Sequence, residues 1–410
     1  MSEFPDGFSG YVRQLSFSPA ERESKTPYKM NLTLLLCREA TEVFGAVFTR
    51  NRMTGAPVIY NRNKMKEDAV RGILVNNRIA NVCTETGPDD INILLRTLDE
   101  KCGFPETQML AASTGIIGWR LPVKEMCQAM NGLTDSACAA DPLQVSRAVM
   151  TTDAYPKLFS VQVGSGRILG IAKGAGMIEP NLATMLVFIM TDIEIERESF
   201  RKHIREVSAD TFNRISVDGD QSTSDMVVGM SSCLRKNPGN GQFREGLYKV
   251  CRFLSRHIVR NGEGASHVIR AEVRGARTRE EADRLAKGIV NSPLVKTAVS
   301  GNDPNVGRIL SALGDTAGNN DIEMAPQKIT LSLGNETVFT NGTFLLDSEK
   351  EIRLNNYLNN AAMEAENIGF PPHEREVIIT VRMNEGKEDG FALGSDLSAE
   401  YVKINADYRT

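Results

Sequence analysis

One threonine stands where the chain could carry out nucleophilic chemistry without a histidine. Thr184 follows the Gly- and Pro-containing segment KGAGMIEPN (173–181) and precedes the apolar run Met185–Met190. If the bond between Ala183 and Thr184 were cut, the new α-amine, with a reference pKa of about 8, would act as the base for the hydroxyl of its own residue. A threonine at the edge of an apolar strand is also ordinary β-propensity, so the position alone is a weak signal.

An attacking hydroxyl also needs hydrogen-bond donors for the oxyanion that it creates. The tripeptide Ser113-Thr114-Gly115 follows the apolar run Met109–Ala112. This pattern predicts a turn after a strand, with a backbone N–H and a hydroxyl able to point into a site. By itself the turn is also a weak signal.

Histidine-based chemistry fits the sequence less well. No histidine stands beside a serine or cysteine in a recognisable nucleophile arrangement; the four histidines are residues 203, 257, 267 and 373. His203 and His257 fall in amphipathic helical patterns, where a structural or solvated role is the better expectation.

Two loops resemble ligand-binding motifs but fail their templates. The stretch DGDQSTSD (218–225) begins like a calcium loop, yet Thr223 and Gly229 occupy positions six and twelve, so a turn followed by a Ser or Thr cap of a helix is expected instead. The segment 173–181 lacks the third glycine of GxGxxG and the GK[ST] ending of a P-loop, which argues against nucleotide binding.

Composition limits the class of protein. Apolar residues make up 41% and charged residues 24% of the 410 residues, which is typical of a globular chain, and no apolar run is long enough to span a membrane. The net charge of −4, without basic clusters, gives no support for a nucleic-acid partner. The seven cysteines form no CxxC pair, so neither a zinc site nor a disulfide framework is expected. With no export signal seen at the N-terminus, a cytoplasmic location is expected.

The elements that must position these residues alternate between strand and helix patterns. Strands are predicted at 46–48, 72–75, 109–112, 158–163, 168–172, 185–190, 329–333, 377–382 and 390–393. Helices are predicted over 122–130, over 200–215 and 243–258 from their apolar spacing, over 278–290 with a capping box at Thr278 and Glu281, and from near Ser398. The chain is therefore expected to be an α/β or α+β protein, with helices layered over mixed sheets.

These segments together resemble the ornithine acetyltransferase family, also called glutamate N-acetyltransferase. The matching stretches span nearly the whole chain in the family's order: AVFTRNR (46–52), STGIIG (113–118), MTTDAYPK (150–157), KGAGMIEPNLATML (173–186), FNRISVDGDQSTSD (212–225), GEGA (262–265), VNSPLVKTAVSGNDPNVGRIL (290–310) and DLSAEYVKINADYRT (396–410). The LATML and INADYRT segments are highly specific to that family.

The resemblance implies roles for individual residues. The chain would adopt the family's self-cleaving threonine-nucleophile acyltransferase fold and cut itself between Ala183 and Thr184. The products would be a strand-rich α chain, 1–183, and a β chain, 184–410, with the nucleophile strand and long helices. Thr184 would be the nucleophile, and Thr114 and Gly115 would stabilise the oxyanion.

The family's substrate contacts fall on residues from both predicted chains: Thr152, Lys173, Thr184, Glu263, Asn405 and Thr410. Thr151 is adjacent, and the sequence does not separate it fully from Thr152. Lys173 would meet a substrate carboxylate and Glu263 the substrate's ammonium group. Because 405–410 would reach back into the site, the chain end is expected to be buried.

The implied reaction is ping-pong transfer of acetyl from N2-acetyl-L-ornithine to L-glutamate through an acetyl-threonine, within arginine biosynthesis. It requires no metal and no bound cofactor, although acetyl-CoA is a possible substrate. The mature form would resemble an α2β2 heterotetramer, without nucleic-acid or membrane partners.

Two departures and three alternatives stay open. Arg78 replaces a glycine of the family in the stretch 76–81, so the backbone there is expected to differ, and Val306 stands where the family commonly has tryptophan. The alternatives are a bifunctional member that also uses acetyl-CoA to make N-acetylglutamate, a related self-cleaving aminopeptidase-like hydrolase, and a member that has lost catalysis and serves in binding or assembly.

Overall fold

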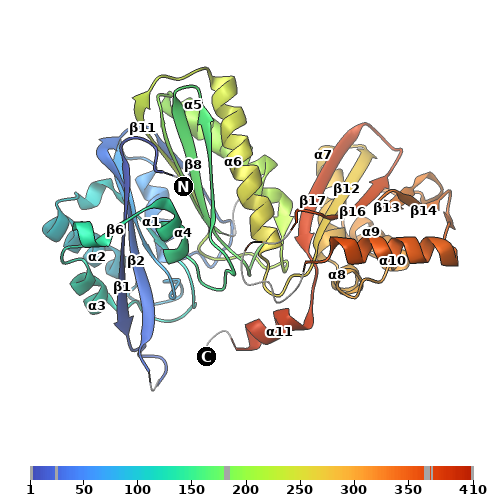
Figure 1. Cartoon of the computed structure of the whole chain (residues 1–410), viewed down its shortest axis with the longest axis horizontal. Helices are drawn as coiled ribbons and strands as arrows, with labels where there is room; N and C mark the ends of the chain where they lie inside the picture. Colours follow the sequence, from blue (N-terminus) through green and yellow to red (C-terminus); the bar gives the residue numbers. More distant parts are fainter. Residues whose placement is uncertain (1–2, 24–25, 180–184, 364–369, 371–372, 408–410) are drawn as a thin grey trace. The chain divides into compact units, whose positions relative to one another are not determined.

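The computed structural model describes residues 3–23, 26–179, 185–363, 370 and 373–407. The chain divides into two compact units (Figure 1). Unit 1 consists of Met1–Gly174, Pro180–Asn213 and Gln221–Ile258, and unit 2 of Ala175–Glu179, Arg214–Asp220 and Val259–Thr410. Both units therefore contain residues from either side of the predicted cleavage bond.

Unit 1 is built on two five-stranded sheets. The first, in the order β5-β4-β2-β1-β6, contains β1 (Phe8–Phe17), β2 (Tyr28–Thr41), β4 (Val70–Asn76), β5 (Met109–Ser113) and β6 (Ala139–Ala140). The second, in the order β3-β11-β9-β8-β7, contains β3 (Phe44–Phe48), β7 (Lys157–Val163), β8 (Gly166–Lys173), β9 (Leu186–Ile193) and β11 (Met226–Arg235).

The two sheets of unit 1 enclose one apolar core and carry helices on their outer faces. Successive residues of a strand point to opposite faces, so Ile73 packs in the core shared with Phe188 of the second sheet while Leu74 packs in a separate core beneath the helices. The helices that complete unit 1 are α1 (Ala56–Lys64), α2 (Gly87–Cys102), α3 (Val123–Ala129), α4 (Pro142–Ala148), α5 (Arg197–Asp210) and α6 (Asn240–Arg260), with short 3₁₀ helices at Glu106–Gln108, Ser136–Cys138 and Phe212–Arg214.

The outer helices of the second sheet approach it closely because of two glycines. A Cβ on Gly170 of β8 would lie 2.5 Å from Val250 of α6, and one on Gly229 of β11 would lie 2.9 Å from Phe200 of α5. The central strand β9 is consequently buried at every residue. A strand covered on both faces needs a continuous apolar run, which is what its sequence provides.

Unit 2 is a single mixed sheet with helices packed on one face. Its order is β10-β17-β12-β16-β13-β14-β15, formed by β10 (Ile215–Ser216), β12 (Val268–Ala276), β13 (Thr330–Leu333), β14 (Glu336–Thr340), β15 (Thr343–Phe344), β16 (Val377–Arg382) and β17 (Glu388–Ser395). The helices are α7 (Arg279–Asn291), α8 (Pro293–Ser300), α9 (Val306–Asn319), α10 (Ser348–Ala361) and α11 (Ala399–Ala406), with a 3₁₀ helix at Pro326–Lys328.

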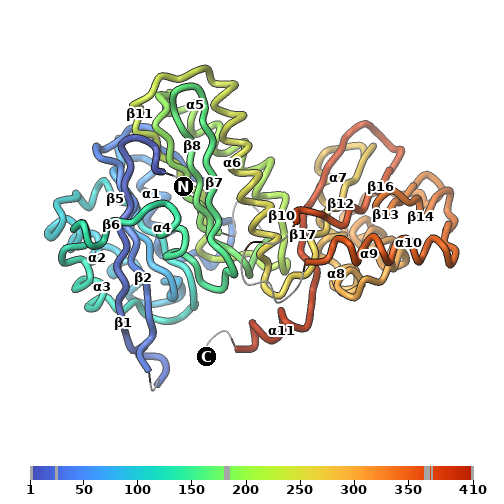
Figure 2. The backbone as a smooth tube through the Cα atoms, viewed as in Figure 1, coloured from blue at the N-terminus to red at the C-terminus, as the bar shows by residue number. Residues whose placement is uncertain are grey.

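The predicted layered α/β architecture with mixed sheets is confirmed. Figure 2 shows the hairpin of β7 and β8, whose turn at Gly164 and Ser165 lies between the strands predicted at 158–163 and 168–172. The Thr278 hydroxyl caps α7 by accepting the N–H of Glu281 at 3.1 Å, as predicted. The Glu281 carboxylate, however, accepts the N–H of Arg277 instead of that of Thr278.

Three local predictions are wrong. The helix expected over 200–215 ends at Asp210, and Ile215 lies in β10 although its spacing continues the apolar stripe. The stretch 218–225 precedes strand β11 and not a capped helix. The chain end at 405–410 was expected to be buried, yet residues 405–407 are exposed, while residues 408–410 lie outside the described residues.

Candidate functional site

The turn after β5 presents two unused hydrogen-bond donors. The N–H of Thr114 donates to the carbonyl of Asn76 at 3.1 Å, which continues the pairing of β4 with β5 beyond the strand ends. Among the described residues, neither the Thr114 hydroxyl nor the Gly115 N–H has a hydrogen-bond partner. A hydroxyl and an adjacent N–H left free at a strand end are the donors that an oxyanion requires.

Gly115 fits its position because it packs directly on the peptide of Arg78. Its φ is +127°, and a Cβ there would lie 2.1 Å from the Arg78 carbonyl carbon. The Arg78 carbonyl accepts the N–H of Ile116 at 2.8 Å. Arg78 itself has φ +87°, a region that favours glycine. The arginine therefore holds a strained backbone conformation that glycine adopts easily. The replacement of the family's glycine by Arg78 introduces backbone strain at this position.

Asn77 connects this turn to the segment that carries Thr152. Its side-chain amide donates to the carbonyls of Ala148 at 3.0 Å and Met150 at 2.9 Å, and its side-chain oxygen accepts the N–H of Asn31 at 2.7 Å. The amide of one buried residue thus fixes the approach to Thr152 from the end of β4. No local pattern indicates this role, because the partners of Asn77 are 46 to 73 residues away.

Asp153 holds the Thr152 segment against the segment of Lys173. One carboxylate oxygen accepts the Gly174 N–H at 2.9 Å and the Lys157 ammonium at 2.6 Å, and the other accepts the Thr151 N–H at 3.0 Å. The side chains of Asp153 and Lys157 are completely buried. Burial would raise the pKa of Asp153, but the ammonium groups of Lys157 and Lys173 and these hydrogen bonds lower it to about 2.

Lys173 keeps its ammonium available. It is half-buried at the end of β8, and no residue in the described ranges forms a hydrogen bond or ion pair with its side chain. The hydroxyls of Thr151 and Thr152 are likewise half-buried and without partners among those residues, so both stay candidates for the predicted contact. A free ammonium beside free hydroxyls suits a carboxylate ligand.

Glu263 and Asn405 meet in unit 2. The Asn405 side-chain amide donates to Glu263 Oε2 at 2.8 Å, and the Glu263 N–H donates to the carbonyl of Ala175 at 2.9 Å. A Cβ on Gly176 would lie 2.3 Å from the same Oε2, so the carboxylate rests against bare backbone. Glu263 is 7% exposed, and a buried carboxylate with so few donors attracts a cation.

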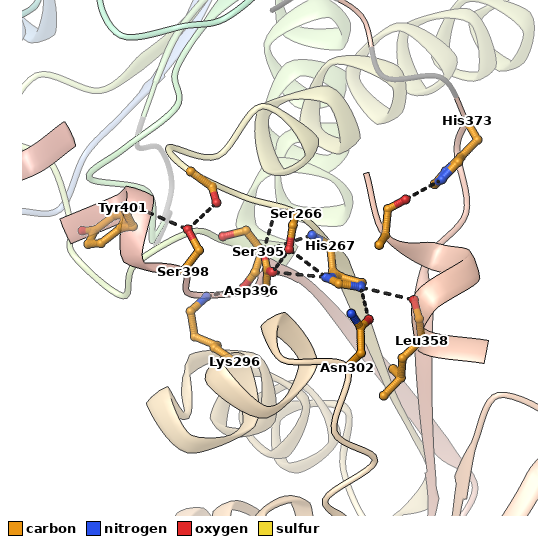
Figure 3. A network of polar contacts seen from close by, with 12 residues as sticks. Ser266, His267, Lys296, Asn302, Leu358, His373, Ser395, Asp396, Ser398 and Tyr401 are labelled. Carbon is orange, nitrogen blue, oxygen red and sulfur yellow. Dashed lines mark hydrogen bonds and ion pairs between the residues drawn. The ribbon is translucent and has the colours of Figure 1, made fainter. Parts of the chain in front are cut away.

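A buried Ser–His–Asp cluster also lies in unit 2, but it is not a catalytic triad (Figure 3). The Ser266 hydroxyl donates to Asp396 at 2.5 Å and lies 2.9 Å from His267 Nδ1, the nitrogen that also faces Asp396 at 3.2 Å. The other ring nitrogen faces the carbonyl oxygen of Leu358 at 3.2 Å. In a triad the serine and the acid contact opposite nitrogens. Here His267 joins the start of β12 to α10.

Beside this cluster, Lys296 of α8 is buried without a carboxylate contact. Its ammonium donates to the carbonyls of Val217 at 2.7 Å and of Ser395. Burial lowers the pKa of Lys296 to about 8, against the opposing attraction of Asp396. Lys296 therefore ties α8 to β17 and to the residue before Asp218.

The remaining predicted site residues, Ala183, Thr184 and Thr410, lie outside the described residues. The structure joins Thr114 to Gly115 in one turn, Thr152 to Lys173 through Asp153, and Glu263 to Asn405. The first two groups belong to unit 1 and the third to unit 2.

Comparison with known proteins identifies the family. The family model described as ArgJ family matches residues 17–410. The arginine biosynthesis bifunctional protein ArgJ of Dehalococcoides mccartyi is 38% identical over 401 residues, covering 94% of this chain and 93% of the relative. The same-named protein of Bacillus cereus is 36% identical over 395 residues, covering 93% and 92%. The chain belongs to the ArgJ family.

A solved ArgJ structure gives a partial overlap. The crystal structure of ArgJ from Bacillus halodurans is 36% identical, with a TM-score of 0.48, and covers 55% of this chain and 100% of that one. The family inferred from the motifs is thus confirmed by the ArgJ family match and by the curated relatives.

Other features of this ArgJ family member concern metals, cysteines and membranes. All seven cysteines are free. Within the described ranges, His, Cys, Asp and Glu form no cluster of three or more that could hold a metal ion. A search of the same ranges finds no helix with the length and apolarity needed to cross a bilayer.

Val306, the second departure from the family, is the first residue of α9 and packs in the core of unit 2.

Proposed function

We propose that this enzyme transfers the acetyl group of N2-acetyl-L-ornithine to L-glutamate, with Thr184 as the acetylated nucleophile. The chain is an acetyltransferase of arginine biosynthesis by its family. The observation that carries the proposed route is the pair of unused donors at the β5 turn, the Thr114 hydroxyl and the Gly115 N–H.

The first step creates the nucleophile. Water adds across the Ala183–Thr184 bond, leaving a carboxylate on Ala183 and an α-amine on Thr184. That amine then accepts the proton of the Thr184 hydroxyl, so no histidine is needed. The Ser266–His267–Asp396 geometry supports this route indirectly, because its histidine has no ring nitrogen free to serve as a base.

Acetyl transfer follows in two halves. The Thr184 oxygen attacks the acetyl carbonyl, and the Thr114 hydroxyl and Gly115 N–H stabilise the oxyanion. The amide bond breaks, and ornithine leaves with the proton held by the Thr184 amine. The amine of L-glutamate then attacks the acetyl ester, which releases N-acetylglutamate and restores the hydroxyl. The proposed chemistry requires no metal and no bound cofactor.

Two groups among the described residues suit the charged groups of the substrates. The free Lys173 ammonium suits a substrate carboxylate, with Thr152 beside it and Thr410 as a further contact. The buried Glu263 carboxylate, held by Asn405, suits the side-chain ammonium of the acetyl donor.

Strand order supports a cut enzyme whose fragments stay together. In the second sheet β9 pairs antiparallel with β8 and parallel with β11, and β11 pairs with β3. The two strands of the predicted fragment 184–410, β9 and β11, therefore lie between strands of the fragment 1–183 within one sheet. We infer an α2β2 assembly of these fragments, acting in the cytoplasm on small molecules.

The test is intact mass and denaturing electrophoresis of wild type beside Thr184→Ala, with Thr184→Ser as the control that keeps a hydroxyl. Wild type and Thr184→Ser should give two fragments and a labelled residue 184 after incubation with acetyl-labelled donor. Thr184→Ala should stay whole and lose at least ~10³-fold in rate. Label on another side chain, or full activity from an uncut wild type, would contradict the proposal.

A second activity is favoured by the word "bifunctional" in the relatives' name. We propose that acetyl-CoA also serves as donor, forming N-acetylglutamate directly. An assay with acetyl-CoA and L-glutamate alone should give product from wild type and none from Thr184→Ala. Product formation only when acetylornithine is present would show a single activity.

A further inference from the structure

Asp218, the first residue of the acidic stretch 218–225, binds two separate segments of unit 2. One carboxylate oxygen accepts the N–H of Ile178 at 2.8 Å. The other accepts the N–H of Met177 at 2.6 Å and the Tyr401 hydroxyl at 3.2 Å. The carboxylate thus joins a backbone segment just after β8 to the helix α11 near the chain end.

The backbone segment is shaped to present its amides to this carboxylate. Met177 has φ +55°, and its N–H and that of Ile178 converge on Asp218, as in the backbone nests that bind anions. The preceding residue, Gly176, is the one against which the Glu263 carboxylate rests. The position of Asp218 therefore determines where the backbone of Gly176 lies beside the Glu263 carboxylate.

The helix is aligned by the same carboxylate. Tyr401 and Asn405 lie one turn apart on α11, and the Asn405 amide donates both to the Tyr401 carbonyl at 3.0 Å and to Glu263 at 2.8 Å. Because α11 has no buried residue, its orientation depends on a few polar contacts. In one of them the Ser398 hydroxyl donates to the carbonyl of Gly264 at 2.6 Å. In another the Tyr401 hydroxyl donates to Asp218 at 3.2 Å.

We propose that Asp218 is a positioning residue that sets both neighbours of Glu263, the backbone at Gly176 and the amide of Asn405. Asp218 touches no substrate in this scheme. It fixes the two neighbours beside which Glu263 receives the side-chain ammonium of the acetyl donor. The inference rests on the proposed function, in which Glu263 binds that ammonium.

Other contacts keep the segment folded when Asp218 changes. The Val217 N–H donates to the carbonyl of Ile178 at 2.7 Å, and Lys287 pairs with Glu179 at 3.0 Å. Asp218→Asn, which has nearly the same shape but one acceptor oxygen instead of two, is therefore expected to shift the segment and not to release it.

The experiment compares N2-acetyl-L-ornithine with N2-acetyl-L-norvaline, the same donor without its ammonium. Selectivity is the ratio of the two kcat/KM values in purified, fully cleaved enzyme. Glu263→Gln should abolish the wild-type preference. Asp218→Asn should reduce the preference by about tenfold through the KM for acetylornithine, and Tyr401→Phe by about threefold, because each loses hydrogen bonds to a charged group.

The matched control is Asp220→Asn in the same loop. Asp220 is exposed; its backbone N–H donates to Asp218 at 3.3 Å, and its carboxylate acts on Asp218 only through its charge. The preference of Asp220→Asn for acetylornithine over acetylnorvaline should equal that of wild type. Hydrogen exchange at the Met177 and Ile178 amides should quicken in Asp218→Asn and stay unchanged in Asp220→Asn.

Three results would overturn the inference. Wild-type preference in Asp218→Asn with only a lower melting temperature would make Asp218 merely structural. A loss of kcat equal for both donors would place its effect elsewhere than at the ammonium. If wild type is neither cut before Thr184 nor acetylated there, both the proposed function and this inference are wrong. If cleavage and acetylation are normal and the preference of Asp218→Asn is unchanged, only this inference is wrong.

Discussion

Asp153 in unit 1 and Asp218 in unit 2 each join separate segments of the chain through hydrogen bonds, but the surroundings shift the pKa of the two carboxylates in opposite directions. Each accepts two backbone N–H groups from segments that carry candidate site residues. The pKa of Asp153 is lowered to about 2, whereas that of Asp218 is raised, because burial outweighs the stabilising effect of its N–H donors. What differs is the nearest charge: two ammonium groups face Asp153, and the Asp220 carboxylate faces Asp218.

The contrast shows that counting donors does not predict the direction in which the pKa of a carboxylate shifts. In unit 1 the ion pair with Lys157 makes the anchor a charged, fully enclosed one. In unit 2 the anchor binds an exposed helix through the hydroxyl of Tyr401, and no ion pair joins Asp218 to another described residue. We expect the first to contribute mainly to stability and the second mainly to the placing of a ligand group.

The largest expected effect comes from breaking the ion pair of unit 1. Lys157→Met should lower the free energy of unfolding by about 3–5 kcal/mol, because it leaves the buried Asp153 charge uncompensated. Asp218→Asn should cost no more than about 1 kcal/mol, since no buried partner charge is left behind. Urea unfolding of both variants measures the difference.

The matched control is Lys249→Met, which breaks an ion pair at the same i,i+4 spacing between residues more than half exposed. Its effect should be within about 0.5 kcal/mol. Adding Asp153→Asn to Lys157→Met should recover part of the loss. Equal losses in Lys157→Met and Lys249→Met would show that burial does not distinguish the two anchors.

Acid should act on the two carboxylates with opposite sign. The folded pKa of Asp153 lies below its unfolded value of about 3.9, so its contribution is complete above that value and is lost as pH falls toward 2. Relative to Asp153→Asn, wild type should lose on the order of 2 kcal/mol between about pH 5 and pH 2.

For Asp218 the folded pKa is raised, so its contribution is complete at low pH and is lost as pH rises through the folded pKa. Relative to Asp218→Asn, wild type should therefore lose stability as the pH rises, whereas relative to Asp153→Asn it loses stability as the pH falls. Urea unfolding at a series of pH values tests both. If stability changed with pH in the same direction for both comparisons of wild type with its Asp→Asn variant, the opposite pKa shifts of Asp153 and Asp218 would be refuted.

The smallest expected effect concerns backbone strain beside each anchor. Arg78 in unit 1 has φ +87° and Met177 in unit 2 has φ +55°. Arg78→Gly should raise the free energy of unfolding by about 1 kcal/mol, because relief of strain exceeds the entropy of the glycine in the unfolded chain. Met177→Gly should be near neutral, since its φ lies in the ordinary left-handed basin.

Arg78→Ala is the control for the arginine side chain. It keeps a Cβ at the strained φ, so it should bring no gain. A gain equal to that of Arg78→Gly would mean that the side chain and not the backbone is unfavourable.

The sequence located the segments of the site but not the residues that hold them. Resemblance placed Thr114, Gly115, Thr152, Lys173, Glu263 and Asn405, and the roles of these residues and of Ala183, Thr184 and Thr410 stay predictions. Asp153 stood within the motif MTTDAYPK and Asp218 within DGDQSTSD, so both were visible as members of motifs. Their role in joining distant segments was not visible, because the long-range partners lie 21 residues from Asp153 and 40 to 183 residues from Asp218.

By itself the sequence determined the alternation of strands and helices, the buried central strand β9, the cap of α7 and the family. These follow from periodicity, local capping and matched motifs, which are short-range properties of the chain. Only the tertiary structure decided that Ile215 lies in β10 and not in the preceding helix, and that Ser266, His267 and Asp396 meet without forming a triad. It also decided that the pKa values of Asp153 and Asp218 shift in opposite directions. Those outcomes depend on which distant groups the fold brings within a few ångströms, and no local pattern encodes that proximity.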